Sequence, residues 1–207
     1  MIYSFNSVVE IGLIILGLLA FPFLGGLLNA LLKETPKEVG DRGEAEVSYC
    51  LLRLDPEAYK VFNNINIPSA KAQLGISQID HLVVSQFGIF VIETKNYTGW
   101  IFGSPERKHW TQVVYSEKNK LYNPIKQNWG HIYALSDFLK VPRNKFKNIV
   151  CFVGDAEFKT EIPRDVFVDS SYIDYINSFK NKVLSEADVD SIKGMLVTEE
   201  DEIALEK

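Results

Sequence analysis

The sequence predicts an α/β domain with a mixed central sheet, preceded by one transmembrane helix. Two patterns predict the α/β domain: three consecutive segments alternate with a period of two, and segments with helical spacing precede and follow them. A long uncharged run near the start predicts the membrane helix. With 46% hydrophobic and 12% aromatic residues, the 207-residue chain is neither disordered nor low in complexity.

The apolar run Ile11–Leu28 contains no charged side chain and continues to Leu32. About 20 helical residues cross the hydrocarbon core of a bilayer, so residues 11–32 are long enough for one transmembrane helix. A secretory signal peptide and a buried core helix are the alternatives. A signal peptide would need a positive charge where Glu10 stands, and a core helix would show polar positions on one face. We therefore expect a membrane anchor.

Basic residues follow the apolar run but do not precede it. Lys33, Lys37 and Arg42 lie on its C-terminal side, so the positive-inside rule predicts a single-pass protein of the cell membrane with a cytoplasmic C-terminal domain. Cys50 and Cys151 have no metal-binding spacing, which agrees with free thiols in a reducing compartment.

The expected organisation has four parts. Residues 1–33 form the N-terminal anchor and residues 34–40 a polar linker. Residues 41–155 form the folded domain, and residues 156–207 an acidic α/β extension.

Helical spacing and proline positions define the predicted helices. Val47, Leu51 and Leu54 share a face that Pro56 ends, while Pro124 suits the first turn of a later helix. In chain order we expect a helix at 41–54, strands at 59–67, 76–85 and 88–96, short strands at 100–102 and 110–115, a helix at 124–139, strands at 148–153 and 166–168, and helices at 172–182 and 186–196.

Charge is distributed unevenly along the chain, whose net charge is −5. Residues 95–147 hold 10 bases and 3 acids, whereas residues 155–207 hold 6 bases and 14 acids. Trp100, Tyr122 and other aromatic residues are interleaved with the bases of the first block. Such a block suits a nucleic-acid backbone. The alternative is a solvated face that the acidic C-terminal part balances.

A predicted hairpin brings two carboxylates together. Gly88 after Gln86-Phe87 is typical of a tight turn between two strands. If Gln86 and Phe87 form the loop, Asp80 and Glu93 lie opposite each other. If Gly88 forms a bulge, the two acids become near neighbours. In either register such a pair requires a cation or a shared proton.

Strand alternation adds Lys95, which shares a face with Glu93. Two carboxylates are hard oxygen ligands that favour Mg²⁺ or Mn²⁺. A lysine beside the metal can orient water and stabilise charge in a phosphoryl transition state. An ordinary cross-strand salt bridge with Asp80 and Glu93 is the alternative.

Two helices offer further candidates. Glu44 lies three residues before Val47, so we expect it along the apolar stripe of the first helix, although a helix-start carboxylate can also be a cap. Gln127 and His131 are four residues apart and share a face of the second helix, where polar surface residues are the alternative.

Three sequence blocks carry a family resemblance. They are GDRGEAEV (40–47), QIDHLVVSQFGIFVIETKNYTGWIFG (78–103) and NPIKQNWGHIYAL (123–135). In this order they resemble the nuclease-related domain (NERD) family, a branch of the PD-(D/E)xK restriction-endonuclease-like superfamily. The resemblance covers roughly Gly40 to Asp155.

The resemblance implies a three-layer restriction-endonuclease-like α/β core and a nuclease that cleaves phosphodiester bonds with Mg²⁺, or with Mn²⁺. DNA is the expected substrate, with RNA as the alternative. By resemblance Glu44, Asp80, Glu93, Lys95 and Gln127 are the catalytic residues. Asp80 and Glu93, with Glu44, would hold the metal.

Two positions depart from the superfamily pattern. Ile79 replaces the proline before the aspartate, and His131 stands where related nucleases often carry tyrosine, so its role stays open. Two other functions compete with a nuclease. One is a non-catalytic nucleic-acid-binding domain of the same fold. The other is a membrane-tethered interaction module that contacts a protein partner through the acidic tail after Glu199.

Overall fold

The computed structural model describes residues 34–70 and 74–196. The predicted membrane span, residues 11–32, lies outside this part of the chain. Among the helices of the described part, none is long and apolar enough to cross a membrane.

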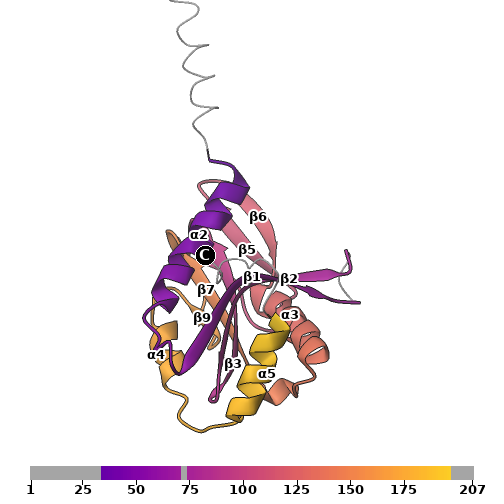
Figure 1. The fold of residues 1–207 in the computed structure, drawn as a ribbon. Helices are drawn as coiled ribbons and strands as arrows, with labels where there is room; N and C mark the ends of the chain where they lie inside the picture. Colours follow the sequence, from indigo (N-terminus) through magenta and orange to yellow (C-terminus); the bar gives the residue numbers. More distant parts are fainter. Residues whose placement is uncertain (1–33, 71–73, 197–207) are drawn as a thin grey trace, which may run out of the picture. The chain divides into compact units, whose positions relative to one another are not determined.

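Along the described chain, helices separate two runs of consecutive strands, and two further helices follow the second run (Figure 1). The helices are α2 (Pro36–Leu51), α3 (Pro124–Leu139), α4 (Tyr172–Asn177) and α5 (Glu186–Leu196), with a 3-10 helix η1 (Arg143–Lys145). The strands are β1 (Tyr59–Pro68), β2 (Ile76–Ser85), β3 (Gly88–Asn96), β4 (Gly99–Phe102), β5 (His109–Val114), β6 (Glu117–Tyr122), β7 (Phe146–Val153), β8 (Ala156–Phe158) and β9 (Val166–Phe167).

The central sheet has the order β1-β2-β3-β7-β9. Strands β1, β2 and β3 pair antiparallel, whereas β3, β7 and β9 pair parallel. The prediction of an α/β domain with a mixed central sheet is therefore confirmed.

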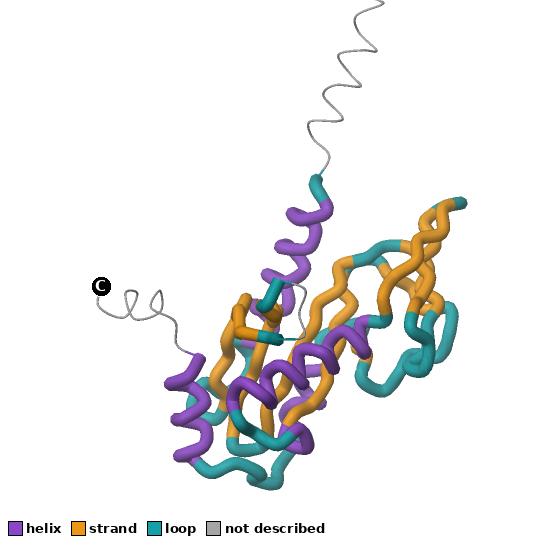
Figure 2. Tube along the Cα trace, turned by 90° about the vertical axis from the view of Figure 1, so that its right-hand side faces the viewer, coloured by secondary structure: helices purple, strands orange, loops and turns teal. Residues whose placement is uncertain are grey.

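Both faces of the central sheet carry helices. On one face, Ile132 and Leu135 of α3 pack with Val91 of β3 and with residues of α5. On the other face, Val47 of α2 and Ile176 of α4 pack in a second cluster. Figure 2 shows helices crossing in front of the strands in the turned view. Each fully buried aliphatic side chain contributes about 1.5–3 kcal/mol to folding, so the two clusters hold the helical layers on the sheet.

A second sheet has the order β6-β5-β4-β8. Its buried side packs Ile101 and Trp110 against Phe152 of β7. A Cβ atom at Gly103 would lie 2.2 Å from the Trp110 ring, so glycine is required for that packing. The sequence predicted β4 and β5 but not that they form a separate sheet.

The start of α3 is fixed by Asn123. Its side-chain oxygen accepts hydrogen bonds from the backbone N–H groups of Ile125 and Lys126, and its amide nitrogen donates to three carbonyls of the loop between β4 and β5. Pro124 follows at the first helical position, where no N–H is needed. The predicted range of α3, 124–139, is confirmed. Because its first turn is fixed in this way, the position of Gln127 relative to β3 is fixed as well.

The predicted boundaries of α2 and α4 were wrong, and α2 ends at Leu51 rather than 54. Helix α2 begins at Pro36 rather than 41, because Thr35 and Glu38 form a capping box in which each side chain bonds the backbone N–H of the other. Most of the expected 34–40 linker is therefore helical. Helix α4 ends at Asn177 rather than 182, because Phe179 leaves it to pack against Phe90 at a ring-centroid distance of 5.3 Å.

Candidate active site

The hairpin of β2 and β3 sets the position of the first two acids. Ser85 pairs with Gly88 across the two-residue turn, and the paired positions continue from there to His81 and Ile92. The predicted register with Gln86 and Phe87 in the loop is therefore confirmed, and it brings Asp80 and Glu93 to the next positions on the two strands.

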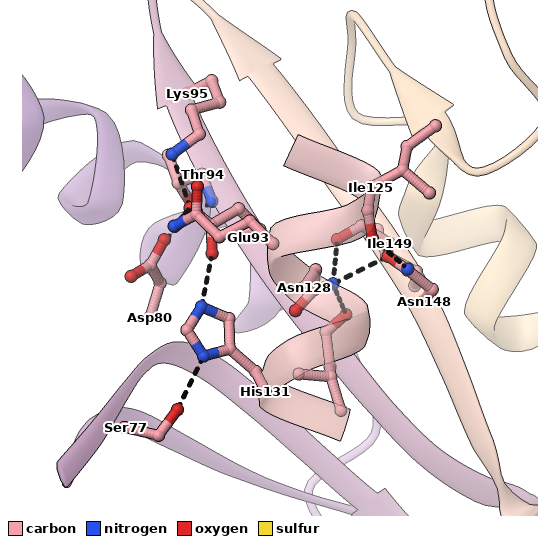
Figure 3. A network of polar contacts seen from close by, with 12 residues as sticks. Ser77, Asp80, Glu93, Thr94, Lys95, Ile125, Asn128, His131, Asn148 and Ile149 are labelled. Carbon is pink, nitrogen blue, oxygen red and sulfur yellow. Dashed lines mark hydrogen bonds and ion pairs between the residues drawn. The ribbon is translucent and has the colours of Figure 1, made fainter. Parts of the chain in front are cut away.

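At the next position, a side chain of β2 rather than its backbone accepts the hydrogen bond from β3. Oδ2 of Asp80 accepts the backbone N–H of Thr94 at 2.8 Å (Figure 3). Burial, and next the negative charge of Glu93, raise the pKa of Asp80 to about 7. Asp80 is thus partly protonated at neutral pH, as expected for a buried carboxyl group beside a second carboxylate.

Glu93 is the centre of the polar network. Its side chain is buried, and Oε1 accepts hydrogen bonds from Nζ of Lys95 at 2.5 Å and from Nε2 of Gln127 at 2.7 Å. Oε2 lies 3.2 Å from Nε2 of His131. Burial raises the pKa of Glu93, but the His131 hydrogen bond and the Lys95 charge outweigh it and hold the pKa below its usual value.

Lys95 remains a cation in this environment. Burial alone would lower its pKa, but the adjacent Glu93 carboxylate outweighs burial and raises it. The strand alternation of Glu93 and Lys95 that the sequence predicted is confirmed, because both side chains lie on the α3 side of β3.

His131 links α3 to two strands. Its Nδ1 lies 2.8 Å from Oγ of Ser77 on β2, while Nε2 faces Glu93 (Figure 3). The shared face of Gln127 and His131 is confirmed, since both contact Glu93. Sequence reasoning did not find Ser77, because only the docking of α3 brings it near His131.

His81 was also missed, although it directly follows Asp80. It is buried, with Nδ1 2.8 Å from Oδ1 of Asn63 and Nε2 3.1 Å from Oγ1 of Thr94. Burial outweighs the attraction of Glu93 and lowers the pKa of His81 to about 4, so the ring is neutral at pH 7. His81 fixes the side chain of Thr94, and the backbone N–H of the same threonine donates to Asp80. The sequence did contain a signal for this residue: a histidine stands among the apolar residues of a predicted strand, and a buried polar side chain needs hydrogen-bond partners.

Glu44 lies at the margin of the site. The buried residues of α2 are Gly43, Val47 and Leu51, and Glu44 lies beside this apolar stripe. Glu44 is half-buried, and its charge contributes to the raised pKa of Asp80. Gly43 permits close packing on β3, since a Cβ atom there would lie 2.7 Å from Cβ of Asn96.

The structure therefore gathers the five predicted residues near the C-terminal end of β3. Glu93, Lys95 and Gln127 are in direct contact, Asp80 is their electrostatic neighbour, and Glu44 acts on Asp80 through its charge.

The oxygen donors suit a hard divalent cation. One carboxylate oxygen of Asp80 accepts the hydrogen bond from the Thr94 N–H, and the negative charge of Glu93 repels that of an ionised Asp80. A divalent cation would remove that repulsion, and carboxylate oxygens are the ligands that Mg²⁺ and Mn²⁺ prefer. In residues 34–70 and 74–196, however, no group of three or more His, Cys, Asp or Glu side chains forms a ready-made metal cluster.

Comparison with known proteins identifies one family. The family model described as NERD, nuclease-related domain, matches residues 39–153. An uncharacterized protein of Bacillus anthracis is 41% identical over 109 residues, which are 52% of this chain and 50% of that protein. The chain thus spans about half the length of this relative. No solved structure matches the chain.

Proposed function

Because the chain belongs to the nuclease-related domain family, we propose that it is a metal-dependent nuclease that hydrolyses phosphodiester bonds of DNA. Family membership supports a nuclease-related function and, more loosely, contact with nucleic acid. The observation that carries the proposal is the Glu93 carboxylate, which Lys95 and Gln127 hold beside Asp80.

The proposal includes a restriction-endonuclease-like core and a membrane anchor. Helical layers on both faces of a mixed sheet support the first. The uncharged run at residues 11–32 and the basic residues after it support the second, with the nuclease domain on the cytoplasmic side.

Asp80 and Glu93 would hold Mg²⁺ or Mn²⁺, with Glu44 as a further carboxylate. When bound, such an ion supplies Lewis-acid activation of the phosphate and of a water molecule. The charged Lys95 offsets negative charge that grows on the phosphate in the transition state. Gln127 fixes the orientation of Glu93, because its amide donates to the same oxygen as Lys95.

The raised pKa of Asp80 adds a consequence for binding. A cation that binds its carboxylate must compete with a proton at pH 7, since the pKa is about 7. We therefore expect divalent-ion affinity to increase between pH 6 and pH 8.

The test is cleavage by the full chain, purified in a mild detergent. Supercoiled plasmid, linear DNA and a single-stranded RNA are incubated with EDTA, Mg²⁺ or Mn²⁺. We expect metal-dependent cleavage that Lys95→Ala and Asp80→Asn strongly reduce, while Lys108→Ala, at an exposed lysine of the same basic block, retains it. Absence of cleavage of every substrate under both metals would refute the proposal.

One observation favours a second candidate, a domain that binds nucleic acid without cleaving it. Both oxygens of Glu93 already contact Lys95, Gln127 or His131, as in a closed structural network. This candidate predicts salt-dependent DNA binding without cleavage in Mg²⁺ or Mn²⁺.

A further inference from the structure

The second sheet has one face that packs in the core and one that does not. Along β4, Ile101 is fully buried, whereas its neighbours Trp100 and Phe102 are 50% and 38% exposed. Since alternate residues of a strand face opposite sides, Trp100 and Phe102 lie on the outer face. We call this outer side, on β6, β5, β4 and β8, the open face.

Strand pairing identifies the other residues of the open face. Trp100 pairs with Val113 of β5, which in turn pairs with Lys118 of β6. Directly paired residues share a face of the sheet. By the same rule Phe102, Thr111 and Lys120 form a second row across the sheet, and His109 pairs with Tyr122.

Three aromatic side chains, those of Trp100, Phe102 and Tyr122, are therefore partly exposed on the open face. Tyr122 is 47% exposed, and its ring contacts that of His109 edge-on at a centroid distance of 6.1 Å. Trp100 and Tyr122 stand on strands separated by β5, which places those strands about 10 Å apart. Exposed rings on a sheet are the surface on which unpaired bases stack.

The charge of the open face is positive at its β6 side. Lys118 and Lys120 are exposed, and within the described part of the chain neither has an ion-pair partner. At the opposite edge Lys159 lies 4.8 Å above the Trp100 ring and pairs with Glu157. The unpaired lysines thus provide a site for phosphate groups beside the rings.

We propose that the open face binds single-stranded nucleic acid. Bases stack on Trp100, Phe102 and Tyr122, and phosphates contact Lys118 and Lys120. A single strand fits better than a duplex, because the bases of a duplex are already stacked on each other and cannot cover the rings. The inference rests on the proposed function in one respect: it names the nucleic-acid form that the nuclease would receive.

The experiment measures binding of fluorescein-labelled dT15 to the full chain in detergent with EDTA, so that cleavage plays no part. Trp100→Leu and Tyr122→Leu keep an apolar side chain but remove the ring. We expect each to weaken binding on the order of 10-fold, whereas Trp100→Phe retains most of it. Tyr49→Leu, at a ring of α2 that is 76% exposed, is the matched control and should bind normally.

The charge contribution is tested separately. Lys118→Gln with Lys120→Gln should reduce the slope of log affinity against log salt by roughly 1.4, since each phosphate contact to a single strand contributes about 0.7. Lys180→Gln with Lys182→Gln, at exposed lysines outside the second sheet, should leave the slope unchanged.

Unchanged dT15 affinity in both leucine variants overturns the proposal, as does a duplex of the same length that binds more tightly than dT15. A change only in self-association or in binding to anionic lipid micelles would also overturn it, and would assign the open face to a second copy or to a membrane surface. Ring-dependent dT15 binding by a chain that never cleaves would support the open face and refute the nuclease.

Discussion

Replacing Asp80 by asparagine should stabilise the folded protein, and the gain should increase with pH. The pKa of Asp80 is raised from 3.8 to about 7, mainly by burial and by Glu93. At about 1.4 kcal/mol per pH unit, ionising Asp80 in the folded state costs up to about 4 kcal/mol. Asparagine stays neutral, and its side-chain oxygen can still accept the Thr94 N–H.

The sign follows from proton linkage. Because the folded pKa lies above the unfolded value, the stabilisation that Asp80 provides is complete below about pH 4 and is lost as pH rises through 7. Asp80→Asn should therefore unfold like the unmodified protein at pH 4, and be more stable by about 2–4 kcal/mol at pH 8.

The assay is urea unfolding of the 34–207 fragment between pH 4 and pH 8, with and without Mg²⁺. Asp137→Asn, at an exposed aspartate of α3, is the control. Mg²⁺ should stabilise the unmodified fragment, by about 2.7 kcal/mol at 100 times its dissociation constant, and should have little effect on Asp80→Asn. A mutational gain that is independent of pH, or an equal Mg²⁺ response in both proteins, would refute the reasoning.

Three other predictions concern separate parts of the molecule. Lys95→Ala should lower DNA cleavage on the order of 100- to 1,000-fold with little loss of DNA affinity, and Lys95→Arg should not restore cleavage, as single-turnover rates and binding titrations would show. His81→Asn should reduce the loss of stability on acidification from pH 6.5 to 4, because the neutral form of His81 is favoured on folding; an unchanged loss in unfolding curves of the variant would contradict this. The full chain should remain in membranes after alkaline carbonate washing, and its release by carbonate alone would exclude an anchor at residues 11–32.

Much of the central fold could be predicted from local patterns. The predicted ranges of β2, β3, α3 and α5 agree with the structure, because alternation, proline positions and helical spacing act over neighbouring residues. Strand β6 was missed: the segment Glu117–Tyr122 is mostly polar and exposed, so its strand conformation depends on pairing with β5. No period in the sequence carries that information.

The candidate site was likewise predicted only where local patterns determine its contacts. Strand alternation placed Lys95 beside Glu93, and helical spacing placed Gln127 with His131. The contacts of Ser77 with His131 and of Thr94 with His81 join residues 54 and 13 positions apart in the sequence. The first contact depends on how α3 packs against β2, and the second joins side chains of the neighbouring strands β2 and β3. A periodic pattern specifies neither pair of side chains.

The backbone amide of Thr94 offers a spectroscopic probe of the candidate site. Its hydrogen-bond acceptor is a carboxylate with a pKa of about 7 rather than a peptide carbonyl. The proton resonance of this amide should therefore shift as Asp80 titrates, in a pH range where other backbone amides with peptide acceptors change little. A two-dimensional NMR spectrum of isotope-labelled protein would then follow protonation and cation binding at a single hydrogen atom, without any substrate.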